Sequence, residues 1–310
     1  MHGPGPGRKT RYARGMRTFW AVAIAVVLGA GGVARADDAA KRVKAIDALL
    51  KHQVELWRNG NGTDDIAPFA ATLTDDGRIA RNGDWLRPDL MLSPPYNISK
   101  LAITKKQIGW SKTWGWVVAE IKLTSRMYAE PEGAGNPHPR PERETYRWIE
   151  LVVADGDAVK GRAIGVYKAM SDGELADLNV VQALPTLASP PANLALLANL
   201  EGLPARLAKD AATSVTGTSA GELGLGVAAA KKLAGGWGKV GLELVGPAKD
   251  ARDPKFYTPI ELTAGDAIVV WGRARMKLAK HPRGYLLDVF GILRKTATGV
   301  EVVAASYAGS

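Results

Sequence analysis

The chain has 310 residues, no cysteine and a formal net charge of +10 at pH 7, from 41 Lys and Arg against 31 Asp and Glu. Six of the bases and none of the acids lie at or before Ala36, so the chain beyond it carries 35 bases against 31 acids, about +4. These bases are dispersed among acids, without a block interleaved with aromatics, so nucleic-acid binding is not supported. Without cysteine the chain has no disulfides and no thiolate metal sites.

The N-terminal segment has the three parts of a secretory leader. Five cations in residues 8–17 precede an apolar run in residues 19–33, and an Ala-Arg-Ala sequence ends at Ala36. The run is shorter than the about 20 apolar residues of a spanning helix and ends in glycines, so cleavage is favoured over an uncleaved membrane anchor. We therefore expect residues 1–36 to be a signal peptide and the protein to be periplasmic or secreted, with no stable membrane anchor after cleavage.

The next segment predicts helices followed by strands. Asp37 and Asp38 can cap a helix that runs to about Arg58, because apolar residues recur at spacings of three and four. These residues are Val43, Ile46, Leu50, Val54 and Trp57. A short helical segment with Ile66, Phe69 and Leu73 follows, and Asp75-Asp76-Gly77 predicts a turn. Strands are predicted over residues 101–108, 114–128, 146–154 and 158–167, with a long polar loop at 129–143.

The second half repeats this order after a proline-rich stretch. Helices are predicted over residues 194–208 and 222–233, then strands over 240–245, 266–278, 285–294 and 300–307. The expected organisation is a first domain at 37–183, a linker at 184–195 and a second domain at 196–310.

The ends of the two halves resemble each other in spacing. Residues 148–164 and 287–303 span the same length, and an Ala-x-Ser sequence follows both. This shared order indicates a tandem repeat, with the final hairpins aligned over these two ranges.

Two further segments carry a resemblance to a known superfamily. They are Trp116-Val-Val-Ala-Glu-Ile-Lys-Leu-Thr124 with residues 151–167, and Ala267-Ile-Val-Val270 with residues 287–307. The chain resembles the nuclear-transport-factor-2-like (NTF2-like) superfamily, especially its SnoaL-like branch. The resemblance implies an α+β fold of two tandem cone-shaped domains, each with helices packed on a strongly curved antiparallel β-sheet. It implies no activity, because the superfamily contains enzymes, binding proteins and assembly modules.

Strand alternation selects the candidate site residues. Trp114, Trp116 and Glu120 share one face of their strand, and Tyr146, Trp148 and Glu150 share one face of the next. The opposite faces are aliphatic, so we expect one side of the sheet to be aliphatic and the other to be aromatic with two acids. The aromatic side is either a ligand surface anchored by Glu120 or Glu150, or an outer face packed against the partner domain or a second chain, and the second interpretation is favoured.

Other candidate chemistry is weaker. The histidines at 52, 138 and 281 lack metal-ligand spacing, no phosphate loop is present, and no catalytic residue, metal or cofactor is assigned. In the second half, Trp271, Arg273 and Arg275 are expected on a solvated face, where Asp288 pairs with one of the two arginines.

The leading hypothesis is an exported noncatalytic protein that binds a small apolar ligand or a protein partner. The alternatives are an isomerase, cyclase or hydrolase that uses Glu120, Glu150 or Asp65 in a pocket, and an envelope scaffolding protein. A carboxylate in an apolar wall has a raised pKa and can move protons at neutral pH. The tandem is expected to form a pseudo-dimer within one chain, which is then a monomer or a homodimer.

Overall fold

The structure, a computed structural model, describes most of the chain after the predicted leader. The described residues are 33–59, 67–81, 84–86, 97–126, 142–169, 184–215, 222–236, 240–247, 258–278 and 281–309. Residues 1–32 of the predicted signal peptide, Asp65 and nearly all of the predicted loop at 129–143 lie outside these ranges.

The first domain contains a long helix and a six-stranded sheet. Its elements are α1 (Val33–Asn59), α2 (Ala67–Ala70), β1 (Leu73–Arg81), β2 (Asp84–Leu86), β3 (Asn97–Ser111), β4 (Trp114–Arg126), β5 (Glu142–Asp155) and β6 (Ala158–Lys168). The strands lie in the order β2-β1-β6-β5-β4-β3.

The second domain contains shorter helices and a seven-stranded sheet. Its elements are α4 (Ala192–Ala198), α5 (Leu203–Arg206), β7 (Leu207–Val215), β8 (Glu222–Gly224), α6 (Val227–Gly236), β9 (Gly241–Val245), β10 (Ile260–Ala264), β11 (Ala267–Leu278), β12 (His281–Thr296) and β13 (Gly299–Gly309). The strands lie in the order β8-β7-β13-β12-β11-β10, and β9 also pairs with β11.

The two domains have the same sheet topology. β9 and β10 run in the same direction and pair with successive parts of β11. Together they correspond to the single strand β3, which pairs with β4 in the first domain. The predicted fold class, α+β with two tandem domains, is therefore confirmed. The predicted domain boundaries stay a prediction. The described part of the predicted linker begins at residue 184 and is hydrogen-bonded to β9, where the amide of Leu187 donates to the carbonyl of Leu244 at 2.9 Å.

The sheets are mixed rather than purely antiparallel, which corrects the expectation from the sequence. β1 runs parallel to β6, and β7 runs parallel to β13. The Asp75-Asp76-Gly77 sequence predicted a turn, but it lies within β1 at a register shift between Leu73 and Arg78. Similarly, residues 207–208 were assigned to the end of a helix, although β7 begins at Leu207. Both strands were missed because local turn and helix signals outweighed their weak alternation.

The structural alignment of the two final hairpins differs from the alignment that the sequence predicts. The β5–β6 pair has a bulge between Leu151 and Val152, and the β12–β13 pair has one between Ile292 and Leu293. Each bulge lies at the same distance from its hairpin turn, so Leu151 corresponds to Ile292 and Glu150 corresponds to Gly291. The predicted alignment of 148–164 with 287–303 is therefore shifted by two residues, which preserves the face of the side chains along β5 and β12.

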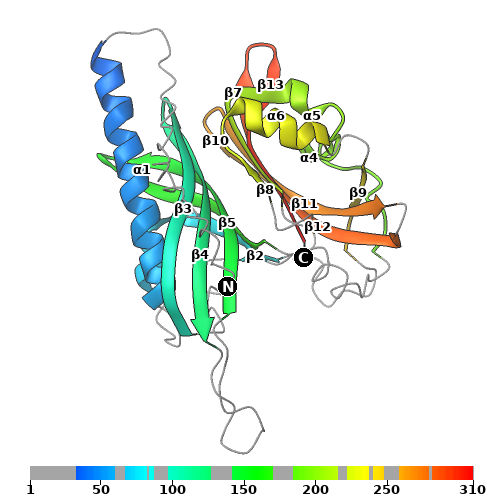
Figure 1. The fold of residues 1–310 in the computed structure, drawn as a ribbon. Helices are drawn as coiled ribbons and strands as arrows, with labels where there is room; N and C mark the ends of the chain where they lie inside the picture. Colours follow the sequence, from blue (N-terminus) through cyan, green and yellow to red (C-terminus); the bar gives the residue numbers. More distant parts are fainter. Residues whose placement is uncertain are drawn as a thin grey trace, which may run out of the picture.

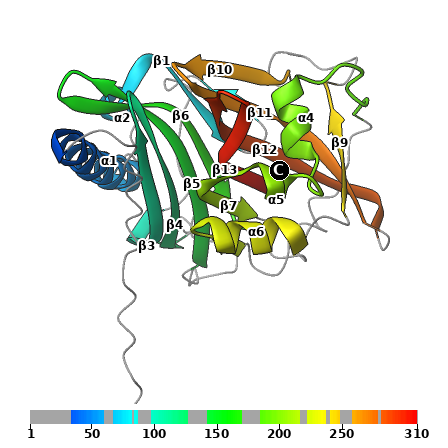
Figure 2. The ribbon, with the colours of Figure 1, turned by 90° about the horizontal axis from the view of Figure 1, so that it is seen from above.

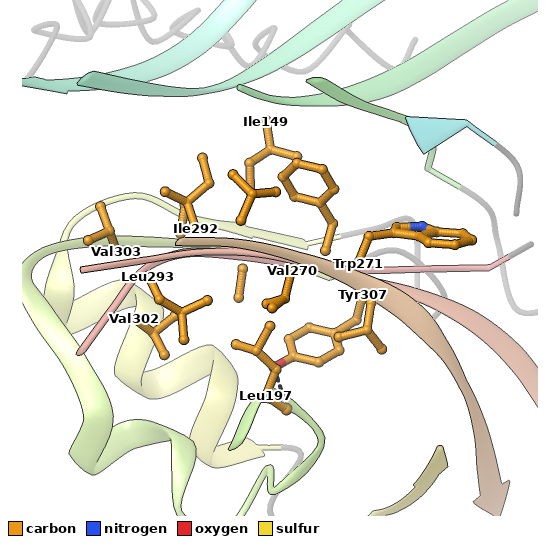
Figure 3. Close-up of a cluster of buried hydrophobic side chains, with 14 of the residues drawn as sticks. Ile149, Leu197, Val270, Trp271, Ile292, Leu293, Val302, Val303 and Tyr307 are labelled. Carbon is orange, nitrogen blue, oxygen red and sulfur yellow. Dashed lines mark hydrogen bonds between the residues drawn. The ribbon is translucent and has the colours of Figure 1, made fainter. Parts of the chain in front are cut away.

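The molecule is layered, with the two sheets packed face to face. α1 covers the side of the first sheet that is turned away from the second domain, while α4 covers the far side of the second sheet (Figures 1 and 2). Between the sheets, Ile149 of β5 points toward the side of the second sheet that carries Ile292 (Figure 3). On the other side of that sheet, the hydroxyl of Tyr307 donates to the carbonyl of Leu197 in α4 at 2.8 Å.

The face of β11 that was expected to be solvated lies against the first domain instead. Trp271 is fully buried and Arg273 is only 8% exposed. Arg273 Nε lies 3.4 Å from Asp288 Oδ1, which confirms the predicted cross-strand pair. The expectation of a solvated face is wrong because alternating arginines indicate solvent only when no second sheet covers them.

Candidate functional site

The pairing of β4 with β5 separates the six candidate residues into two groups. Trp116 is directly opposite Leu151, and Trp148 is directly opposite Ala119. Residues directly opposite each other share a face of the sheet. Trp114, Trp116 and Glu120 therefore lie on the face toward the second domain, whereas Tyr146, Trp148 and Glu150 lie on the face toward α1. The expected single aromatic face with two acids is wrong, because alternation within each strand does not fix which residues of the two strands are paired.

The tryptophans of the first group are part of the core between the domains. Trp114 and Trp116 are both fully buried, in one cluster with Phe290 and Ile292 of the second sheet. The Trp114 indole N–H donates to Asp266 in the turn between β10 and β11. These side chains join the two domains and leave no ligand surface at this position.

The negative charge of Glu120 is balanced by a buried arginine. Its Oε2 lies 2.7 Å from Nη1 of Arg147, and the Thr104 hydroxyl donates to Oε1 at 2.7 Å. Burial acts to raise the pKa of Glu120, but the Thr104 hydrogen bond and the Arg147 charge outweigh it and hold the pKa below its usual value. Glu120 is therefore ionised at neutral pH and is suited to a structural role.

The second group faces α1 and forms an aromatic interior with it. The Trp57 ring contacts Tyr146 edge to face, with centroids 5.1 Å apart, and lies 6.3 Å from Trp148. Phe69 lies on the other side, 6.4 Å from Trp148. This arrangement follows from the apolar stripe of α1, which places Trp57 against the sheet.

Glu150 is the acid of this interior. It has no exposed surface, and its Oε1 and Oε2 accept hydrogen bonds from Gln53 Nε2 at 2.9 Å and from Trp148 Nε1 at 3.0 Å. No salt bridge to it is recorded among the described residues. Burial raises the pKa of Glu150 to about 7, and the two hydrogen bonds offset only part of this effect. Near neutral pH this carboxyl can therefore either accept or donate a proton.

The space for this carboxyl depends on Gly161 in β6. A Cβ at Gly161 would overlap Oε1 of Glu150 and would lie 2.6 Å from Leu73 Cδ2. On the helix side, Gln53 Nε2 also donates to the Thr72 hydroxyl at 3.2 Å. We call Gln53, Trp57, Trp148 and Glu150 the first-domain interior site.

The second domain has no acid at the corresponding position. Gly291 takes the place of Glu150, and a Cβ there would overlap the side chain of Leu197 from α4. The side chain of a helix residue therefore occupies the volume that holds the carboxyl in the first domain. The two domains therefore share a backbone fold, but only the first has a buried carboxyl at this position.

One open groove lies elsewhere in the second domain. It has a volume of about 460 Å³ and lies between α4 and β9, with Leu187, Leu242 and Glu243 among its lining residues. Among the described residues, no cluster of three His, Cys, Asp or Glu is arranged to hold a metal ion. Within the same ranges, none of the helices has both the length and the apolar character needed to cross a membrane.

Sequence reasoning found Tyr146, Trp148 and Glu150 but missed their partners. Gln53 lies three residues after Leu50 and four before Trp57, so its place on the predicted apolar stripe was the available signal for a polar contact across the core. Gly161 gave no signal, because its role depends on a side chain that comes from the neighbouring strand.

Comparisons with known proteins give a likeness in fold. No family model matches the chain, and no curated protein matches its sequence. An NTF2-like protein from Cytophaga hutchinsonii is 15% identical with a TM-score of 0.31, covering 40% of this chain and 94% of its own. A ketosteroid isomerase-like protein from Erwinia carotovora atroseptica is 17% identical with a TM-score of 0.29, covering 42% and 97%. ActVI-ORFA from Streptomyces coelicolor is 13% identical with a TM-score of 0.31, covering 40% and 95%.

The solved structures that resemble part of the chain thus include an NTF2-like protein, from the superfamily that the sequence resembles. The likeness concerns the fold of part of the chain and adds nothing on activity.

Proposed function

We propose that the protein binds a small, largely apolar ligand in the first-domain interior site, with Glu150 as its polar anchor. The observation that carries this proposal is a fully buried carboxyl without a cationic partner among the described residues, held by Gln53 and Trp148. A buried ionisable group costs free energy unless it is paired, so such a group in the middle of a core favours a functional role.

The wall of the site supports an apolar ligand. Trp57, Phe69, Tyr146 and Trp148 present ring surfaces around a single acid, and binding sites for small molecules generally combine apolar walls with a few polar groups. The rings meet one another edge to face or tilted, and a cyclic ligand can pack against them in the same ways.

The features of the second domain favour a structural role for it rather than ligand binding. Leu197 fills its interior at the position equivalent to Glu150, and its sheet buries the tryptophans of the first domain. We therefore propose one ligand per chain, with the second domain taking the place that a second subunit occupies in a dimer.

A proton-transfer enzyme is the second candidate, favoured by the pKa of Glu150. A carboxyl with a pKa of about 7 is present in both protonation states at neutral pH, which suits an isomerase, cyclase or hydrolase that moves a proton within an apolar site. In this case Glu150 is the acid or base. Conversion of the bound molecule by the intact chain, lost in Glu150→Gln, supports the enzyme; release of the molecule unchanged supports binding alone.

We also propose export as the setting of this function, on the basis of the cations, apolar run and Ala-Arg-Ala sequence that end at Ala36. Fractionation of cells, with N-terminal sequencing of the product, tests it. A product that begins at Asp37 outside the cytoplasm is the expected result, and an intact cytoplasmic chain contradicts export.

The binding proposal is tested by native mass spectrometry of the chain purified from its source. We expect a small molecule bound at one per chain, and we expect Glu150→Gln to reduce its occupancy. The matched control is Glu243→Gln in the groove between α4 and β9, which leaves occupancy unchanged. If Glu243→Gln releases the molecule and Glu150→Gln retains it, the ligand site is the groove and the proposal is wrong.

A further inference from the structure

Two polar atoms on α1 are left without partners inside the first-domain interior site. Oε1 of Gln53 is a hydrogen-bond acceptor and Nε1 of Trp57 is a donor, and neither has a hydrogen-bond partner among the described residues. Gln53 is fully buried and Trp57 is 3% exposed. An unsatisfied buried polar group costs free energy, so a bound group that satisfies both atoms would be favoured.

The two atoms belong to the same small region. Gln53 and Trp57 are four residues apart on one helix, which places their side chains next to each other on one face. Gln53 contacts Glu150 and the Trp57 ring packs beside Trp148, which is itself hydrogen-bonded to Glu150. A ligand that enters between α1 and β5 would therefore meet both side chains.

The orientation of the Gln53 amide is fixed by its neighbours. Its nitrogen donates to Glu150 Oε1 at 2.9 Å and to the Thr72 hydroxyl at 3.2 Å. When Glu150 is ionised, turning the amide over would place its oxygen against a carboxylate oxygen and would lose the first hydrogen bond. Gln53 therefore presents an acceptor to the site, whereas Trp57 presents a donor.

This pair of atoms selects the chemistry of the ligand. A hydroxyl group donates and accepts hydrogen bonds, so it satisfies both atoms at once. A purely apolar ligand would leave both unsatisfied. A carboxylate would meet the oxygens of Gln53 and Glu150 without a cation, because the buried Arg147 lies on the other face of the sheet, paired with Glu120.

We infer that the ligand of the first-domain interior site carries a neutral hydroxyl group on an otherwise apolar ring system, with the hydroxyl donating to Gln53 Oε1 and accepting from Trp57 Nε1. The inference rests on the proposed function of this site. It adds the class of ligand: an uncharged alcohol or phenol rather than a hydrocarbon or an acid.

Equilibrium dialysis with three probes of the same ring size tests this inference on the intact chain. The probes are 2-naphthol, naphthalene and 2-naphthoate, at neutral pH. We expect 2-naphthol to bind about 25-fold more tightly than naphthalene, since two neutral hydrogen bonds each contribute about fivefold. We expect 2-naphthoate to bind more weakly than either.

Trp57→Phe sharpens the test, because it removes the N–H and keeps an aromatic ring. We expect it to lower the preference for 2-naphthol over naphthalene by about fivefold, the value of one such hydrogen bond. The control is Trp116→Phe, which removes an equally buried indole N–H without a partner on the opposite face of the sheet and leaves the preference unchanged.

The outcomes separate this inference from the proposed function. If none of the three probes binds, the proposed ligand site fails. If naphthalene binds as tightly as 2-naphthol, or 2-naphthoate binds best, the hydroxyl inference is overturned while the site stands. The probe comparison on the unaltered chain is decisive even if Trp57→Phe does not fold.

Discussion

Replacing Glu150 with Gln should change how stability depends on pH. Burial raises the pKa of Glu150 from 4.5 to about 7 in the folded chain. Between these two values the folded state binds more protons than the unfolded state, so the free energy of unfolding falls as pH rises through this window. The effect is absent below about pH 4.5 and complete above about pH 7.

The magnitude follows from the width of the window. About 2.5 pH units at about 1.4 kcal/mol each give a loss of about 3 kcal/mol from this one carboxyl. Gln has nearly the same shape and does not ionise. Glu150→Gln should therefore gain about 3 kcal/mol relative to the unaltered chain when the pH is raised from about 4.5 to about 8.

Urea unfolding of both proteins at the two pH values measures this difference, and the titration of all other groups cancels between them. Glu120→Gln is the matched control on the same sheet. The pKa of Glu120 is lowered, so its stabilisation is present above its ordinary pKa of 4.5 and is lost only as pH falls below that value. The control should therefore be less stable than the unaltered chain, by nearly the same amount at both pH values. A Glu150→Gln difference that is the same at both pH values would refute the assignment of a raised pKa to Glu150.

Three further outcomes are expected. Gly161→Ala should destabilise the chain by about 1–3 kcal/mol and weaken 2-naphthol binding, because the added methyl group overlaps the Glu150 carboxyl; unchanged binding in calorimetry contradicts this. Trp116→Ala should cost about 3–5 kcal/mol in urea unfolding, since it empties the core between the sheets, and a loss below about 1 kcal/mol would show that this core contributes little. Glu120→Gln should leave 2-naphthol affinity unchanged while lowering the free energy of unfolding by about 3 kcal/mol, because Arg147 loses its ionised partner. Loss of 2-naphthol binding in a stably folded variant would show that Glu120 belongs to the ligand site.

The sequence predicts the tandem and its helices well where periodicity is strong. The stripe that ends at Trp57 predicts the buried face of α1, and the strands predicted over 146–154 and 158–167 form the β5–β6 hairpin. β1 was missed because Asp75-Asp76-Gly77 has the composition of a turn, yet it forms a bulge that is stabilised by pairing with the distant β6. Such pairing is a tertiary effect that local propensity does not contain.

The site was predicted in part for a related reason. Trp148 and Glu150 were selected by alternation along β5, which a single strand reveals. The sequence placed Trp116 with them, because the pairing between two strands separated by a long loop is not encoded in either strand alone. The contact between Gln53 and Glu150 joins residues 97 positions apart, which only the folded chain brings together.

Labelling the side-chain carboxyl carbon of Glu150 and following it by NMR across pH tests the central claim most directly, namely that this buried acid lines a ligand site. The account predicts a titration midpoint near 7 in the free protein and a changed midpoint when 2-naphthol binds beside the carboxyl. A midpoint near 4.5, or a resonance that does not respond to saturating 2-naphthol, would contradict it.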